Sequence, residues 1–206
     1  MSGYYETLNG AEEYARTHST IPDFYERDIQ LLVDYLHPIK DEKILELGVG
    51  SGRDAKLLLQ MLGSSYTGID ISYPMFLQAR QNNEGRFLNL SDQNLMHLAF
   101  PGSTFDAIWA AAVFHHISPA QFREGLAEAH RVLRPGGHFF ISVRSNGDFE
   151  EIDPRTKLTY YHYSVATLTQ ALDQVGFETL SHSQVSIPLE GRSISYLKML
   201  AQKNPQ

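Results

Sequence analysis

Apolar residues recur along the chain in two patterns: short continuous runs, and longer stretches in which they return at helical spacing. The short runs predict strands at 43–47, 66–70, 86–90, 105–111, 138–143, 177–187 and 193–201. The helical spacing predicts helices at 10–17, 22–36, 53–62, 74–81, 118–133 and 164–175.

The order of these elements indicates the fold class. Strands alternate with helices up to residue 175, and the last two strands follow one another directly. The run "FDAIWAA" at 105–111 is apolar almost throughout, as expected of a strand that is covered on both faces. We therefore predict an α/β fold with a doubly wound, mostly parallel sheet of seven strands, a C-terminal antiparallel hairpin and helices on both faces. No internal repeat or low-complexity linker is visible, so residues 1–206 are predicted to form one domain.

Composition and charge narrow the class of protein. The chain is 42% hydrophobic and 20% charged, which is ordinary for a globular protein. Its net charge of −7 and its lack of a Lys/Arg block disfavour a general nucleic-acid binder. The absence of cysteine excludes disulfides, thiolate nucleophiles and cysteine metal sites, and fits a reducing compartment. No apolar run is long enough to span a membrane, and we predict a cytoplasmic enzyme.

The stretch "ILELGVGSGRD" (44–54) places three glycines between a strand and a helix, where a ligand can approach the backbone. Its glycine spacing differs from the G-x-G-x-x-G of dinucleotide-binding folds. Asp70 ends the next strand, where a carboxylate can accept both hydroxyls of an adenosine ribose. Glu46 would repel a phosphate beside the turn. These residues favour a cationic or zwitterionic ligand with an adenosine end.

Four segments together resemble the class I S-adenosylmethionine-dependent methyltransferases, in particular the small-molecule branch: "ILELGVGSGRDAKLL", "YTGIDIS", "FDAIWAAAVFHHIS" and "HRVLRPGGHFFISV". The resemblance covers roughly residues 40 to 200, in the family's order. It implies a Rossmann-like fold, S-adenosyl-L-methionine as cofactor and S-adenosyl-L-homocysteine as product. The segment "AEEYA" (11–15) resembles the family's lid, so 1–38 is predicted as an N-terminal helical lid and 39–206 as the cofactor-binding core.

The resemblance also implies roles for individual residues. The predicted cofactor contacts are Tyr14, Glu46, Gly48, Val49, Gly50, Gly52, Arg53, Asp70, Ile71, Met75, Asp92, Gln93 and Ala110. Glu46 would hold the cofactor ammonium and Asp92 the adenine amino group. The loop after the third strand is longer than the family pattern, which leaves the adenine-binding residue within 90–97 open. Arg53 would share the cofactor carboxylate with Tyr14 or pair elsewhere on the surface, and it is not expected to share a helix face with the adjacent Asp54.

The acceptor end of the site is predicted from two further clusters. His115 and His116 follow the fourth strand, and one of them is the first candidate for a general base. Adjacent histidines diverge, so at most one should face the pocket, and no accompanying ligand set suggests a metal. Tyr160, Tyr161 and Tyr163 would line the substrate or serve as core residues.

The predicted reaction is direct displacement of a methyl group onto a small-molecule acceptor, which requires no nucleophilic side chain. Three alternatives stay open at this point: a tRNA wobble-base methyltransferase, a nicotinamide oxidoreductase, and a catalytically silent S-adenosylmethionine-binding module. The acidic balance counts against the first and the glycine spacing against the second. Both a monomer and a homodimer are compatible with the sequence.

Overall fold

The computed structural model describes residues 4–18, 23–36, 42–62, 65–84, 89–189 and 192–205. Its helices are α1 (Leu8–Thr17), α2 (Asp23–Leu36), α3 (Arg53–Leu62), α4 (Tyr73–Asn82), α5 (Pro119–Val132) and α6 (Val165–Gln174), with one 3₁₀ turn, η1 (Phe114–His116). Its strands are β1 (Lys43–Leu47), β2 (Ser65–Asp70), β3 (Asn89–Asp92), β4 (Phe105–Ala111), β5 (Leu133–Arg144), β6 (Glu150–Ile152), β7 (Thr159–Tyr161), β8 (Phe177–Leu189) and β9 (Arg192–Lys203).

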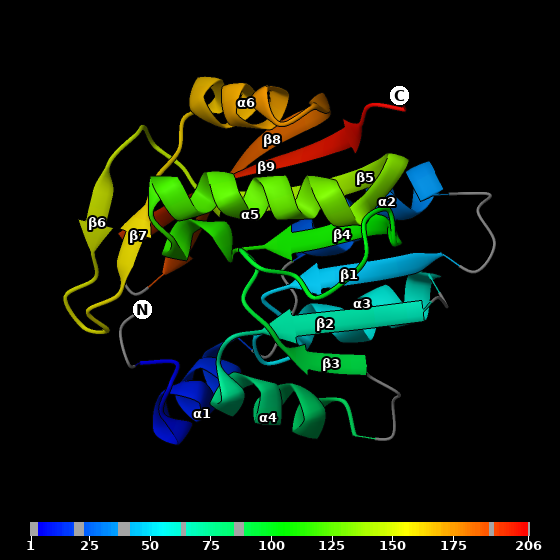
Figure 1. Cartoon of the computed structure of the whole chain (residues 1–206). Helices are drawn as coiled ribbons and strands as arrows, with labels where there is room; N and C mark the ends of the chain where they lie inside the picture. The colour runs from blue at the N-terminus through cyan, green and yellow to red at the C-terminus, as the bar shows by residue number, and fades with distance from the viewer. Residues whose placement is uncertain are drawn as a thin grey trace.

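Seven strands form one sheet in the order β3-β2-β1-β4-β5-β9-β8 (Figure 1). Strands β1 to β5 run parallel, whereas β9 is antiparallel to both β5 and β8. The predicted fold class is therefore confirmed. The chain moves from β1 outward through β2 to β3 and then returns to place β4 on the other side of β1. This reversal is the topological switch point at which such sheets bind ligands.

Two hydrophobic layers hold the helices against the sheet. Along β4, Ile108 and Ala110 pack with α5 and α6 on one face, while Ala107 and Trp109 pack with α2 and α3 on the other. This alternation follows from the two-residue period of a strand. Five buried α2 side chains belong to the second layer, namely Tyr25, Ile29, Leu32, Val33 and Leu36. The N-terminal part of the chain therefore contributes α2 to the core. Its other helix, α1, packs against α4 (Figure 1).

The elements differ most from the predicted ones in three places. The third strand was placed at 86–90; 86–88 lie outside the described residues, and β3 continues to Asp92 because its backbone pairs with β2 up to Asp70. The last two side chains of β3 are polar, so a search for apolar runs does not find the end of this edge strand. Strand β5 begins at Leu133, since a register shift opposite Phe105 accommodates the "RPGG" turn. The polar segment after β5 contains the small hairpin β6–β7.

None of the described helices is both long and apolar enough to cross a bilayer.

Candidate functional site

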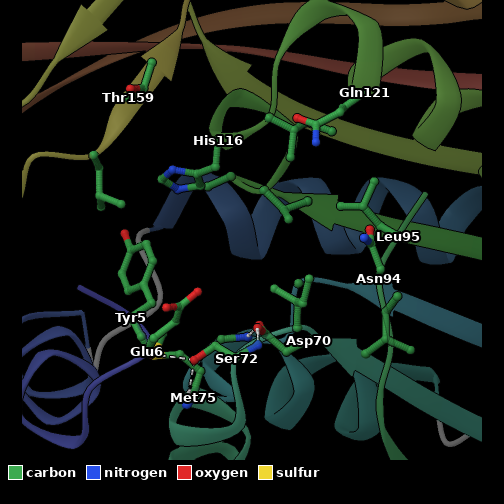
Figure 2. Close-up of a pocket in the computed structure, with 18 of the residues that line it drawn as sticks. Tyr5, Glu6, Asp70, Ser72, Met75, Asn94, Leu95, His116, Gln121 and Thr159 are labelled. Atoms are coloured by element: carbon green, nitrogen blue, oxygen red, sulfur yellow. Dashed lines mark hydrogen bonds between the residues drawn. The ribbon is translucent and has the colours of Figure 1, made fainter. Parts of the chain in front are cut away.

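A cavity of about 400 Å³ lies where the strands on both sides of the switch point end. Its floor comes from the turn after β1, the end of β2 and the loops after β3 and β4. Tyr5 and Glu6 close one side, and the β6–β7 hairpin contributes Lys157, Leu158 and Thr159 (Figure 2). A groove built from so many separate segments is the usual place for a small-molecule site in this architecture.

The glycine turn lets the backbone form the cavity floor. Gly48 and Gly50 have φ values of 73° and 53°, in the left-handed region that favours glycine. A Cβ on residue 48 would lie 2.5 Å from the Cγ2 of Val113. The loop after β4 therefore comes closer to the turn after β1 than any residue other than glycine at position 48 would allow. A Cβ on Gly50 would meet nothing nearer than the Cε of Met75 at 3.5 Å. Gly50 therefore borders open space, in which a ligand can lie against the chain.

Asp70 stands at the centre of this floor. Its Oδ2 accepts from the Gly50 N–H at 2.8 Å and its Oδ1 from the Ser72 N–H at 2.8 Å. Burial raises the pKa of Asp70, and these two backbone N–H groups oppose that shift by stabilising the carboxylate. A carboxylate offers about four acceptor positions, so both oxygens keep capacity for a ligand hydroxyl. Asp70 thus orders the two loops and presents acceptors to the cavity (Figure 2).

A second cavity of about 30 Å³ lies beside the first and shares Tyr14, Gly48, Gly50 and Ala111 with it. Burial, together with the nearby Asp54, raises the pKa of Glu46 well above its ordinary value, and the Tyr66 hydroxyl donates to Glu46 Oε2 at 2.5 Å. Two acidic side chains at one buried place favour the arrival of a cation.

Arg53 does pair with its neighbour, contrary to the expectation from their adjacency. Its Nε lies 2.6 Å from Asp54 Oδ1, and Trp109 Nε1 donates to the other oxygen at 3.0 Å. The expectation was wrong because it considered the helix surface alone. At the start of α3 the long arginine side chain can fold back over the first turn, and its guanidinium also lies over the Tyr25 ring. The small cavity therefore presents both signs of charge.

His116 lies on the wall opposite Asp70, and its imidazole projects into the cavity (Figure 2). No described residue hydrogen-bonds to its Nδ1, which is buried. Burial, and then the charge of Arg144, lowers the pKa of His116 to about 3. The ring is therefore neutral at physiological pH. His115 is buried and does not line the cavity, so only one of the two histidines faces it, as expected. The rings do not diverge, however: their centroids are 4.4 Å apart, and both rings lie against Tyr160.

Known proteins are similar to much of this sequence. Residues 44–137, which carry the glycine turn, Asp70 and both histidines, match a family model described as "Methyltransferase domain". An uncharacterised methyltransferase of Geobacillus kaustophilus is 31% identical over 139 residues, which are 68% of this chain and 62% of that protein. A demethylmenaquinone methyltransferase of Tropheryma whipplei is 36% identical over 145 residues, 69% of this chain and 58% of that protein.

The chain belongs to the S-adenosylmethionine-dependent methyltransferase family. It spans about three fifths of the length of these two curated methyltransferases. A similar fold occurs in the 1,6-didemethyltoxoflavin-N1-methyltransferase of Burkholderia thailandensis, solved with 1,6-didemethyltoxoflavin and S-adenosylhomocysteine. That structure has a TM-score of 0.67 and 24% identity, and the match covers 87% of this chain and 79% of that one.

The structure of this family member brings most of the predicted site residues together. Those that line one or both cavities are Tyr14, Glu46, Gly48, Val49, Gly50, Arg53, Asp70, Ile71, Met75, Gln93, His116 and Tyr161. Six do not line either cavity: Gly52, Asp92, Ala110, His115, Tyr160 and Tyr163.

Packing explains where these six residues lie. Gly52 packs against α4, where a Cβ would be 2.5 Å from Asn83 Nδ2, and Ala110 is fully buried in the core. Asp92 ends the edge strand with its side chain outside the cavity lining. Tyr160 lies under the Arg144 guanidinium, and Tyr163 packs on Phe122.

The structure also adds lining residues that the sequence reasoning missed. After β3 these are Asn94 and Leu95, which follow the predicted Gln93, and after β4 they are Ala111, Ala112 and Val113. Ala112 has a φ of 59°, and its N–H donates to both the hydroxyl and the carbonyl of Ser142. Such backbone strain at a site has no signature in an alanine-rich run of sequence. Ser72, by contrast, had a detectable signal, because it precedes Pro74 as the N-cap of α4.

The lowered pKa of His116 predicts a pH dependence of stability. Between pH 6.5 and about 3 the unfolded chain binds this proton and the folded protein does not, so the free energy of unfolding falls as the pH falls through that window. The contribution of this one residue is at most about 1.4 kcal/mol per pH unit. Urea titrations across this pH range should show that the free energy of unfolding falls less steeply with falling pH in His116→Phe than in the wild type. The difference in slope should be at most about 1.4 kcal/mol per pH unit. Parallel curves for the two proteins would contradict the assignment.

Proposed function

We propose that this protein is an enzyme that transfers a methyl group from S-adenosyl-L-methionine to a small-molecule acceptor. The observation that carries the proposal is the single cavity that joins the Asp70–Gly50 floor to the His116 wall. Cofactor and acceptor would thus meet in one enclosed space, which is what a direct transfer requires. The similar methyltransferases of Tropheryma whipplei and Burkholderia thailandensis are named for demethylmenaquinone and 1,6-didemethyltoxoflavin, which supports a small-molecule acceptor for this protein.

The described residues fit the cofactor at both of its ends. Asp70 has spare acceptor capacity for the two ribose hydroxyls, and Gly50 leaves room for the ligand against the backbone. The small cavity carries Glu46 and Asp54 for an ammonium and Arg53 for a carboxylate, which matches a zwitterionic amino-acid end. Ile71, Met75 and Gln93 would surround the base.

When bound, S-adenosyl-L-methionine supplies a methyl group activated by a positively charged sulfur. The chain itself contributes alignment and exclusion of water rather than a covalent partner. Tyr5 helps to enclose this space, because its backbone carbonyl accepts from the Ser72 hydroxyl, which fastens the N-terminal segment to the start of α4. The lid predicted at 1–38 stays a proposal for the part that carries Tyr5 and α1, which agrees with this contact, because α2 packs in the core. A cytoplasmic location and a role independent of nucleic acid remain predictions from the sequence.

Selective binding of the adenosylated ligands is the expected result. Calorimetric titration of the wild-type protein should give micromolar affinity for S-adenosylmethionine and S-adenosylhomocysteine and no measurable binding of NADH. The reason is that the carboxyl groups of Glu46 and Asp54 lie beside the glycine turn, where they disfavour the approach of a pyrophosphate. Binding of NADH, or of neither class of ligand, would reject the proposal.

A further inference from the structure

The chemistry of the acceptor can be inferred from polar groups on the wall of the cavity opposite Asp70. Gln121 is one of them, and its amide orientation is fixed by its place in α5. It is the third residue of that helix, and its Oε1 accepts from both the N–H and the hydroxyl of Ser118, the N-cap residue, each at 3.1 Å. The carbonyl oxygen is thus occupied, and the amide nitrogen points into the cavity (Figure 2). No described residue accepts from this nitrogen, and because Gln121 is exposed, the nitrogen is open to solvent or to a ligand in the cavity.

His116 lies on the same wall and limits how the acceptor becomes nucleophilic. Its imidazole is neutral, because burial, and then the charge of Arg144, lowers its pKa and so opposes uptake of a proton. A residue in that environment is a poor base for an ordinary alcohol or phenol. It can donate one N–H hydrogen bond, since a neutral imidazole carries one donor and one acceptor nitrogen. The acceptor should therefore arrive already ionised or otherwise nucleophilic.

The charge that lines this wall is that of Lys157, which favours an anion over a cation. Lys157 lines the cavity from the hairpin side and forms no ion pair with a described residue, whereas Arg144, which lies over the Tyr160 ring at 3.3 Å, is ion-paired with Glu151 at 3.0 Å. The lining carboxylates are Asp70, engaged by backbone N–H groups, and Glu6, which lies beside Tyr5 across the cavity from Gln121 (Figure 2). Apolar surface from Leu95, Ile117 and Leu158 completes the acceptor end.

We propose that the acceptor is a flat, conjugated hydroxy-carbonyl compound, an inference that rests on the proposed methyl-transfer function. The compound binds as its oxyanion, with its carbonyl oxygen on Gln121 and its ionised oxygen beside His116. Conjugation to the carbonyl makes the hydroxyl acidic, so the proton leaves to solvent before transfer and no base is required. The oxyanion then forms a bond to the methyl carbon while the carbon–sulfur bond breaks and sulfur keeps the electron pair. One negative and one positive charge are neutralised, which a water-excluding cavity accelerates.

The test uses three ring compounds of similar size on the full-length protein saturated with S-adenosylhomocysteine. 2-Hydroxy-1,4-naphthoquinone is ionised at neutral pH and carries the carbonyl, 2-naphthol has a neutral hydroxyl and no carbonyl, and 2-amino-1,4-naphthoquinone replaces the hydroxyl by nitrogen. Because the chain has no cysteine, thiol adducts with the quinones are excluded. Calorimetry should show the hydroxyquinone binding at least about tenfold more tightly than the other two.

Gln121→Glu is the decisive variant, because glutamate preserves the helix cap and turns the cavity-facing donor into an acidic oxygen. Hydroxyquinone affinity should fall at least about tenfold, while S-adenosylhomocysteine affinity and the unfolding temperature stay unchanged. Gln170→Glu, on the exposed face of α6, makes the same charge change away from the cavity and should have no effect.

Two outcomes would overturn the inference alone: equal or tighter binding of the naphthol or the amine, or an unchanged hydroxyquinone affinity in Gln121→Glu. If S-adenosylhomocysteine itself does not bind, the proposed function fails, and the inference fails with it.

Discussion

Replacing Asp70 by alanine is expected to reduce the affinity for S-adenosylhomocysteine by at least about 100-fold. The carboxylate would accept two charge-assisted hydrogen bonds from the ribose, and each such bond contributes about 1.5–3 kcal/mol. The variant also loses the two backbone contacts, from Gly50 and Ser72, that join the loop after β1 to the loop after β2. Calorimetric titration of the purified variant measures the loss directly.

Asp92→Ala is the matched comparison for this prediction. Asp92 pairs with Asp70 across the β2–β3 ladder, but its side chain is exposed and does not line the cavity. We expect its replacement to change the affinity by less than about tenfold. If the two variants lose affinity equally, Asp92 reaches the cofactor after all and the adenine contact predicted from the family resemblance is correct. If Asp70→Ala binds as tightly as the wild type, the proposed cofactor site is in the wrong place.

Trp109→Ala should destabilise the fold by about 3–5 kcal/mol. The indole is fully buried in β4, is stacked on Phe140 with ring centroids 3.9 Å apart, and donates to Asp54. Its removal leaves a large void between the sheet and helices α2 and α3, and deprives a buried carboxylate of its neutral donor. Urea unfolding with a fixed m-value would measure this change in the free energy of unfolding.

Trp109→Phe separates the two contributions. It keeps most of the apolar contact and removes only the N–H donor, so a loss of about 1–3 kcal/mol is expected. Because Asp54 also holds Arg53, this variant should weaken cofactor binding more than its effect on stability alone implies. Equal destabilisation by phenylalanine and alanine would mean that the hydrogen bond to Asp54, and not packing, dominates at this position.

The fold could be predicted from the sequence because each buried strand and helix leaves a local pattern. The run at 105–111 is apolar apart from Asp106, since β4 has helices on both faces, and the caps Ser118 and Ser164 stand where α5 and α6 begin. The prediction was less accurate where hydrogen bonding replaces burial. The end of β3 is polar because an edge strand is held by its backbone, and the β6–β7 hairpin is too short to produce a periodic pattern.

The sequence by itself determined the chemistry near the glycine turn. The strand, the glycine spacing and the carboxylate of Asp70 lie within 27 residues of one another, from 44 to 70, and local geometry brings them together. The tertiary structure decided the opposite wall. Gln121, Lys157 and Tyr5 come from three distant segments, and only the packed fold places them around one cavity. The tertiary structure also decided which histidine faces that cavity, because the direction of a side chain in a 3₁₀ turn depends on what surrounds it. The imidazole of His116 is neutral because of burial and of the charge of Arg144, which lies 28 residues further along the chain.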